Sequence, residues 1–317
     1  MIYLKWAGRM ANRLIEYLFA LAIHKETGCG IKCSMDHIID EECKEAIPGF
    51  PNVKDRESCV KVNLEPPIFC IGGQKPIVSE KTEDQSVVVR SLISYEALFD
   101  LAQEHDLEVQ GFFQRIEFLS KYKNLAREVC ECNAPIHPLI RSKVDYENDL
   151  VIHLRYGDYH HHHQADKISW THKPLEVEEV LAIFNKIRTQ IAVKQTWIVC
   201  EHTDDVCVRT IASSIPNSYI VSVSPTHDFA FISKFKHVFA SPSTFSFMAS
   251  WTSDICQKVF FPMVGAFHPE SHKAKDAGQP ECRWNLFIDD DRFTYIDLAN
   301  DKLPFLKYKQ LDVDNIL

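Results

Sequence analysis

Apolar and polar positions along this chain follow helical and strand spacings in turn, and the order of these patterns predicts repeated strand–helix pairs. The apolar segment Met1–Leu4 is followed by a turn at Gly8. From about Asn12 to Thr27, apolar residues recur every three or four positions, as on one face of a helix, and Gly28 ends the pattern. In the rest of the first half, the same patterns predict strands over 86–91 and 108–114 and helices over 95–105 and 118–132.

The second half of the chain alternates more regularly. Apolar runs predict strands over 150–154, 196–200, 219–223, 238–240 and 258–261, separated by helices over 176–191, 204–213, 229–235 and 244–253. This order predicts a parallel sheet with helices on both faces, while 264–278 is expected to be a loop. Two prolines within 133–138 mark a linker, and 317 residues exceed what one core usually serves. We therefore expect two domains, 1–146 and 147–317.

The predicted strand Leu150–Leu154 ends on a charged turn. His153 and Arg155 lie two positions apart, so their side chains are expected on the same side of the chain at its carboxyl end. Ligands bind at that end of the strands in open α/β sheets, and a guanidinium matches a phosphate or a carboxylate two oxygens at a time. The alternative is that Arg155 pairs with a structural carboxylate such as Asp158.

A second candidate anion site follows the strand predicted at 238–240. Ser241, Ser243 and Thr244 place three hydroxyl groups at the start of a helix, where free N–H groups and the helix dipole favour a negative charge. Ser243 is also a suitable helix cap. These two roles are compatible, and we favour an anion site here.

Other polar residues near predicted helix starts allow two interpretations. Asn12 follows Gly8 and is either a helix cap or a ligand contact. Asp204, Asp205 and Asp228 suit the first turn of a helix as caps, and they would also accept hydrogen bonds from a ribose or a guanine edge. From the residues alone, capping is the favoured interpretation for all of them.

Composition excludes several classes of function. The formal net charge is −9 and no stripe of lysine and arginine is present, which argues against a nucleic-acid or anionic-membrane surface. The eleven cysteines form no zinc-ligand spacing, and adjacent residues among the four histidines 160–163 point in opposite directions, so no metal is expected. Without a signal sequence or membrane span, we expect a soluble, cytoplasmic protein with reduced thiols.

Five blocks of the chain, in order, resemble the motifs of the α-1,2-fucosyltransferases of glycosyltransferase family 11. The family has Gly-Gly-Leu-Gly-Asn-Gln before a helix, Gly-Tyr-Phe-Gln at a strand end, His-Ile-Arg-Arg-Gly-Asp-Tyr, Ser-Asp-Asp and Ser-Asn-Ser-Ser/Thr-Phe-Ser-Trp. The blocks that resemble these motifs here are Gly8–Arg13, Gly111–Gln114, His153–Tyr159, Thr203–Asp205 and Ser241–Phe247. The resemblance extends in pattern to the wider group of GDP-fucose-dependent transferases.

The resemblance implies a GT-B fold, in which two Rossmann-like domains with parallel sheets face each other across a cleft. The first domain would serve the glycan acceptor and the second would hold the nucleotide-sugar donor, with fucose transferred by inversion and without a metal or other cofactor. By motif position, His153 and Asp228 would contact the base, Arg155 the β-phosphate, and Ser243 with Thr244 the pyrophosphate. Asn12 would approach from the first domain, and Asp204 belongs to the block that resembles Ser-Asp-Asp.

Three departures from the family pattern bear on the substrate. Tyr156 stands in place of the second arginine, Ala11 and Arg13 replace a glycine and a glutamine, and Phe247-Met248 replaces a tryptophan pair. A transferase for another nucleotide sugar and an inactive sugar-binding relative therefore remain alternatives. Arg155 is expected to stabilise the leaving diphosphate. The candidates for the base that deprotonates the acceptor hydroxyl are Glu117, Asp158, His163 and Asp166.

Overall fold

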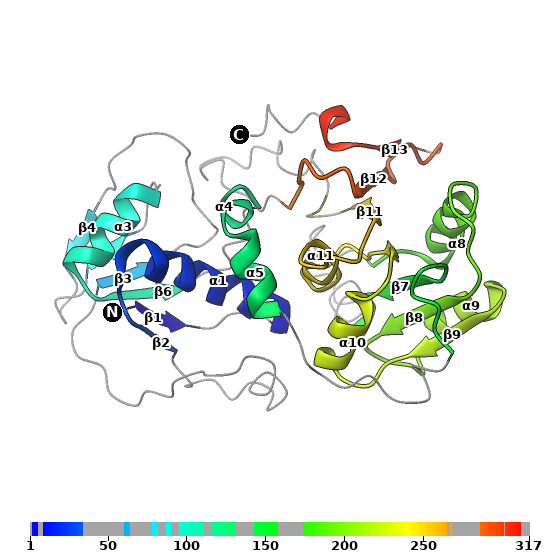
Figure 1. Ribbon diagram of the computed structural model, residues 1–317, viewed down its shortest axis with the longest axis horizontal. Helices are drawn as coiled ribbons and strands as arrows, with labels where there is room; N and C mark the ends of the chain where they lie inside the picture. The colour runs from blue at the N-terminus through cyan, green and yellow to red at the C-terminus, as the bar shows by residue number, and fades with distance from the viewer. Residues whose placement is uncertain are drawn as a thin grey trace. The chain divides into compact units, whose positions relative to one another are not determined.

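The structure is a computed structural model that describes residues 2–5, 9–33, 60–63, 78–81, 87–89, 95–110, 116–130, 143–157, 174–264, 267, 286–300 and 302–311. The chain forms two compact units, one of Met1–Val129 with Lys275–Leu286 and the other of Cys130–Ala274 with Phe287–Leu317. Each unit contains its own sheet (Figure 1). Sequence patterns suggested a boundary after residue 146, whereas the compact units divide after Val129.

The first unit is built on a six-stranded sheet with the order β2-β1-β6-β3-β5-β4. All of its strand pairs are parallel except β4 with β5. Its strands are β1 (Ile2–Lys5), β2 (Ile31–Cys33), β3 (Val60–Asn63), β4 (Val78–Lys81), β5 (Val87–Val89) and β6 (Leu107–Gln110). Its helices are α1 (Met10–Thr27), α3 (Tyr95–Glu104), α4 (Ile116–Lys121) and α5 (Lys123–Cys130).

Helix α1 confirms the first strand–turn–helix prediction but begins two residues earlier than expected. Its N-cap is Arg9, which makes no side-chain capping hydrogen bond, and Asn12 is already the third helical residue. The interpretation of Asn12 as a cap is therefore wrong. The helix ends as expected at Gly28, whose φ of 73° lies in the left-handed region that glycine adopts without steric cost, and its N–H donates to the carbonyl of His24.

The sequence patterns missed β2, β3 and β4, which have only three or four residues each. Such short segments do not show a clear two-residue period, and β3 and β4 also contain lysine, asparagine, serine and glutamate. The helix predicted over 118–132 is interrupted at Tyr122, between α4 and α5. The Tyr122 hydroxyl donates to the carboxylate of Glu26 on α1 at 2.8 Å, a tertiary contact that no local pattern encodes.

The second unit contains a seven-stranded sheet with the order β13-β12-β11-β10-β7-β8-β9. Every strand pair is parallel except β12 with β13. The strands are β7 (Leu150–Leu154), β8 (Thr196–Cys200), β9 (Ser218–Val221), β10 (His237–Phe239), β11 (Lys258–Met263), β12 (Phe293–Asp297) and β13 (Phe305–Leu306). Counted from β7, the six parallel strands follow the order 3-2-1-4-5-6 of a Rossmann sheet, which reverses between β7 and β10.

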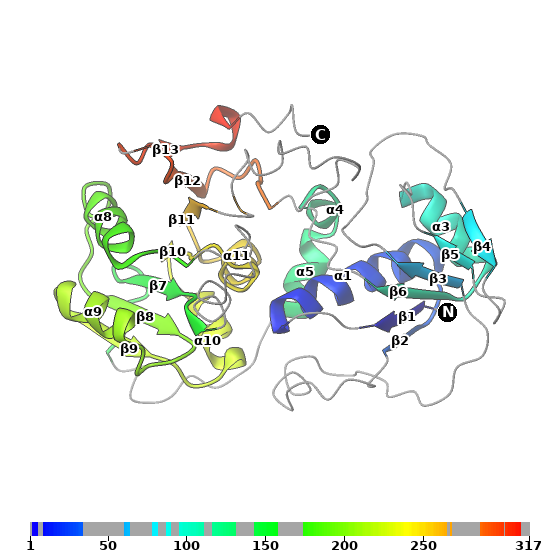
Figure 2. The same ribbon diagram turned by 180° about the vertical axis from the view of Figure 1, so that it is seen from behind.

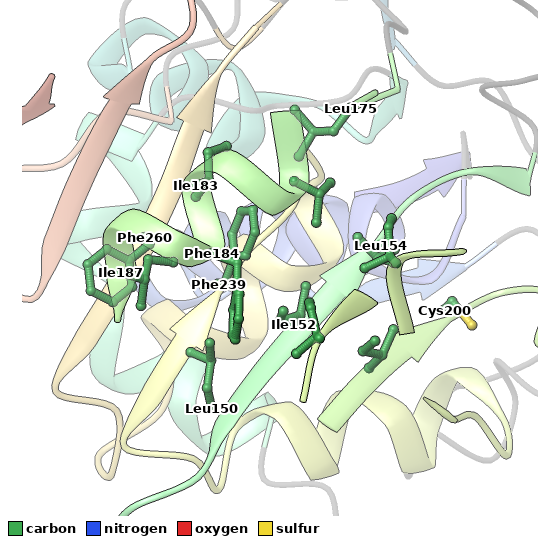
Figure 3. Packing of buried hydrophobic residues seen from close by; sticks show 14 of the residues in the cluster. Leu150, Ile152, Leu154, Leu175, Ile183, Phe184, Ile187, Cys200, Phe239 and Phe260 are labelled. Atoms are coloured by element: carbon green, nitrogen blue, oxygen red, sulfur yellow. The ribbon is translucent and has the colours of Figure 1, made fainter. Parts of the chain in front are cut away.

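Helices cover both faces of this sheet (Figure 2). On one face, α8 (Val177–Ile187) and α9 (Val206–Ser214) pack their apolar residues against alternate positions of the strands, including Ile152, Phe239 and Phe260 (Figure 3). On the other face, α10 (Pro225–Ile232) and α11 (Thr244–Trp251) place aromatic rings against the intervening positions. Burial on both faces explains why every residue of β7 and β8 is buried.

The second unit departs from the predicted boundaries chiefly at α10, which was expected over 229–235. Ser224 accepts a hydrogen bond from the N–H of His227, and Pro225 occupies the first helical position, so the helix begins four residues earlier. Serine followed by proline is a known helix-start signal, which the apolar pattern alone did not use. The strands β12 and β13 and the short 3-10 helix Tyr308–Gln310 lie beyond the predicted elements.

The prediction of an α/β protein with two Rossmann-like, largely parallel-sheet units, the composition of a GT-B fold, is confirmed. That the two sheets face each other across a cleft stays a prediction. Among the residues described, no helix has the length and apolar character needed to cross a membrane.

Candidate functional site

The carboxyl edge of the second sheet brings two of the predicted motifs together. β7 lies beside β10, with Ile152 opposite Phe239, so that His153 near the end of β7 lies beside the residues that follow β10. The strand order reverses between these two strands, and a parallel sheet forms its ligand-binding crevice at such a point. Residues 88 positions apart in the sequence thus form one candidate site.

His153 is the buried link between the two motifs. Its Nδ1 lies 2.6 Å from the hydroxyl oxygen of Ser241, and its ring stacks on Phe245 with centroids 5.2 Å apart. Burial, with a smaller contribution from the positive charge of Arg155, lowers the pKa of His153 to about 3. The imidazole is therefore neutral at pH 7 and holds the β7 and β10 strand ends together.

Serine residues make the hydrogen bonds that organise the start of α11. Ser243 is the N-cap, and its hydroxyl accepts from the N–H of Phe245 at 3.2 Å, so its predicted capping role is confirmed. Ser246 donates to the carbonyl of Ser241 at 3.1 Å, and the Ser243 N–H donates to the same carbonyl at 2.7 Å. Thr244 is the first helical residue. An anion at this helix start remains a prediction.

Arg155 lies just past the end of β7 and pairs with Glu201, which lies just past the end of β8. One guanidinium nitrogen, Nη1, is 3.4 Å from Glu201 Oε2, and the side chains are 16% and 27% exposed. The alternative that Arg155 pairs with a carboxylate is thus realised, but with Glu201, while Asp158 lies outside the described residues. The sequence analysis did not identify Glu201. Its position beside Arg155 depends on the register that aligns Leu154 with Cys200, and tertiary packing sets that register. The signal that could have identified Glu201 is a charged residue directly after a buried strand, as at Arg155.

The acidic residues gather on the β8–β9 side of the same edge. Asp205 caps α9, accepting from the N–H groups of Cys207 and Val208, whereas Asp204 is exposed and does not cap. Burial first, and then the carboxylates of Asp228, Asp205, Asp204 and Glu201, raise the pKa of the Cys200 thiol to about 12. The edge is therefore acidic around the end of β8, while Arg155 and the α11 start lie toward β7 and β10.

Asp228 lies in the first turn of α10 and is 8% exposed. It accepts from the Ser222 hydroxyl at 2.8 Å and from the Val223 N–H at 3.0 Å. These bonds close the connection between β9 and α10, while the N-cap of that helix is Ser224. Asp228 thus has a structural role in this loop, and its contact with a base remains a prediction.

Tyr156 stands where the family motif has a second arginine, and it lies in the hydrophobic core. Its side chain packs with Leu154, Leu175 and Val180, and its hydroxyl donates to the Leu175 carbonyl at 2.8 Å. The idea that Tyr156 marks an altered sugar pocket finds no support in this position. At this position the chain therefore has a buried core side chain where the family motif has a cation.

The remaining candidates lie in the first unit or outside the described residues. Asn12 lies in α1 and Glu117 in α4, both in the first unit. Gly8, Asp158, His163 with its neighbours 160–162, Asp166 and the Gly111–Gln114 block lie outside the described residues. Within the described ranges, no three histidine, cysteine, aspartate or glutamate side chains cluster as metal ligands would.

Comparison with known proteins gives a structural likeness and no sequence match. No family model matches the chain, and no curated protein matches it. NodZ α-1,6-fucosyltransferase soaked with GDP-fucose is similar at 10% identity and a TM-score of 0.42, over 81% of this chain and 93% of that one. The same enzyme co-crystallised with GDP matches at 11% identity, a TM-score of 0.40 and the same coverage, and NodZ from Bradyrhizobium at 11%, 0.38, and 81% and 94%.

Proposed function

We propose that this protein is an inverting glycosyltransferase that transfers fucose from GDP-fucose to a hydroxyl group of a glycan. The observation that carries the proposal is the junction of two motif blocks at one edge of a Rossmann sheet. His153, near the end of β7, contacts Ser241 after β10 where the strand order reverses, and Arg155 and Ser243 follow these two residues in the sequence. The motif resemblance suggests the donor and the sugar, and the guanidinium of Arg155 with the N–H groups at the α11 start supports binding of a diphosphate.

The charges at this edge suit the two halves of a nucleoside diphosphate. Arg155 and the N–H groups at the α11 start favour the diphosphate, which gathers negative charge as it leaves. The exposed carboxylate of Asp204 on the β8 side is an acceptor for ribose hydroxyl or guanine N–H groups. Neutral His153, buried beside Ser241, adds no second charge to this edge.

In the proposed reaction, the acceptor oxygen forms a bond to the anomeric carbon as the bond from that carbon to the diphosphate oxygen breaks. The bonding electron pair leaves with GDP, and the hydroxyl proton passes to a base. The developing charge on the diphosphate is stabilised by Arg155 and the α11 start without a metal. Glu117, Asp158, His163 and Asp166 remain candidates for the base.

Isothermal titration calorimetry in EDTA tests the donor and the metal independence together. We expect GDP to bind and UDP to bind at least ten times more weakly, with no change when EDTA is replaced by Mg²⁺. Tighter binding of UDP would contradict the GDP assignment. Binding that requires the metal would contradict the proposed mechanism.

Turnover of GDP-fucose distinguishes an enzyme from an inactive relative. We expect release of GDP to rise when a mixture of glycan acceptors is added, with formation of a fucosylated product detected by mass spectrometry. Binding of GDP-fucose without hydrolysis or transfer would identify a sugar-binding protein. A panel of other nucleotide sugars, run in the same assay, would reveal a different donor.

A further inference from the structure

Glu201 and Arg155 form an ion pair at the place where the proposed function puts a diphosphate. The two residues follow adjacent buried strands, and the pairing of Leu154 with Cys200 sets them side by side. The guanidinium is thereby held at the sheet edge by a carboxylate. Since both side chains are partly exposed, the pair is open to exchange with a dissolved anion.

The absence of a side chain at Gly157 leaves space for the Glu201 carboxylate. A Cβ atom added at Gly157 would lie 2.7 Å from the carboxyl carbon of Glu201 and closer still to Oε2. Gly157 is buried, so the carboxylate rests against the backbone two residues after Arg155. The chain therefore accommodates Glu201 in close contact with the loop that begins at Arg155.

We propose that Glu201 is a positioning residue that holds Arg155 ready and yields it to the diphosphate of the donor. The proposal rests on the proposed function for the identity of the donor, but not for the exchange itself. An incoming phosphate takes the place of the Glu201 carboxylate at Nη1 of the guanidinium, so the two anions compete for the same donor. The glutamate thus weakens anion binding while keeping the empty site ordered.

A different role for Glu201 makes the opposite prediction. An acidic residue at the end of the second strand of a Rossmann sheet accepts hydrogen bonds from a ribose. If Glu201 had that role, removing its charge would weaken binding of any ligand with a ribose and leave inorganic anions unaffected. The observed contact with Arg155 favours exchange with the phosphate.

The experiment compares wild type with Glu201→Gln, using pyrophosphate, GDP and guanosine as probes in calorimetry. We expect Glu201→Gln to bind pyrophosphate and GDP about five times more tightly, in keeping with an exposed ion pair worth up to about 1 kcal/mol, and guanosine unchanged. The matched control is Glu178→Gln, which removes an exposed carboxylate from the first turn of α8 and should leave all three affinities unchanged.

A double-mutant cycle with Arg155→Ala separates exchange from simple repulsion, with pyrophosphate binding followed by phosphorus NMR. Because Glu201 acts through Arg155, adding Glu201→Gln to Arg155→Ala should change pyrophosphate affinity by less than two-fold. Should Glu201→Gln fail to fold, Glu201→Ala takes its place in every arm.

Several results would overturn the proposal. They are weaker or unchanged pyrophosphate binding in Glu201→Gln, a five-fold gain that persists without Arg155, and no pyrophosphate binding in either protein. Failure of the proposed function looks different. In that case pyrophosphate binds and responds to Glu201→Gln as expected, but GDP binds no better than pyrophosphate.

Discussion

Two carboxylates on neighbouring strands of the second unit, Asp149 and Glu201, show how differently the two edges of one sheet are used. Asp149 precedes β7 at the amino edge and is fully buried. It accepts from the backbone N–H groups of Asp145 and Gln195 at 2.9 and 3.1 Å and from Trp197 Nε1 at 2.8 Å. Glu201 follows β8 at the carboxyl edge, is 27% exposed, and lies 3.4 Å from Nη1 of Arg155 and 3.9 Å from Nε2 of His202.

This difference indicates what each edge of the sheet contributes to stability and to binding. The partners of Asp149 are neutral N–H groups fixed by the fold, and no dissolved ligand can take their place without unfolding the strand starts. The partner of Glu201 is a cation on a side chain, which an anion from solution can bind instead. Stability is therefore expected to depend on the amino edge, and binding on the carboxyl edge.

The largest expected effect is on stability, at the amino edge. Asp149→Ala leaves three N–H donors, one of them the buried indole N–H of Trp197, without their acceptor, so we expect the free energy of unfolding to fall by about 3–4 kcal/mol. Urea denaturation measures this loss, and pyrophosphate affinity of the folded fraction should stay within two-fold of wild type. A variant as stable as wild type would remove the contrast between the edges.

The next effect is on binding, at the carboxyl edge. Arg155→Ala should weaken pyrophosphate and GDP binding at least about 100-fold, since two charge-assisted hydrogen bonds contribute about 1.5–3 kcal/mol each. Stability should change by less than about 1 kcal/mol, because the pair with Glu201 is partly exposed. Arg155→Lys should recover little, since an ammonium group does not reproduce the planar fork. Near wild-type affinity in the lysine variant would show that Arg155 is structural.

The smallest effect tests His153, a buried residue at the binding edge. Its pKa of about 3 lies below the ordinary 6.5, so the unfolded chain binds the proton more readily. The stability it contributes is complete above pH 6.5 and is lost as the pH falls toward 3. Between pH 7.5 and pH 5, wild type should lose about 2 kcal/mol more than His153→Gln in urea denaturation. Equal losses in both proteins would mean that His153 is protonated without cost.

Local patterns determined the alternating elements of the second unit, because its strands are apolar runs, even where β10 has only three residues, and its helices are long enough to show a period. They also located His153, Arg155 and Ser243 at element ends, since a change from apolar to polar residues marks where a strand emerges from the core. Local patterns did not identify the short strands β2, β3 and β4, since their three or four residues carry no clear period. They also missed the early start of α10, since Ser224 and Pro225 lie outside the apolar pattern.

The tertiary structure alone decided which strand ends are neighbours, and therefore what the polar residues do. Placing β10 beside β7 gave His153 its partner Ser241, and the register of β7 with β8 gave Arg155 its partner Glu201. The tertiary structure also places the Tyr156 side chain in the hydrophobic core, although Tyr156 adjoins Arg155 in the sequence. Sequence order fixes which residues end each strand, but the partners across strands depend on long-range packing, which no local spacing records.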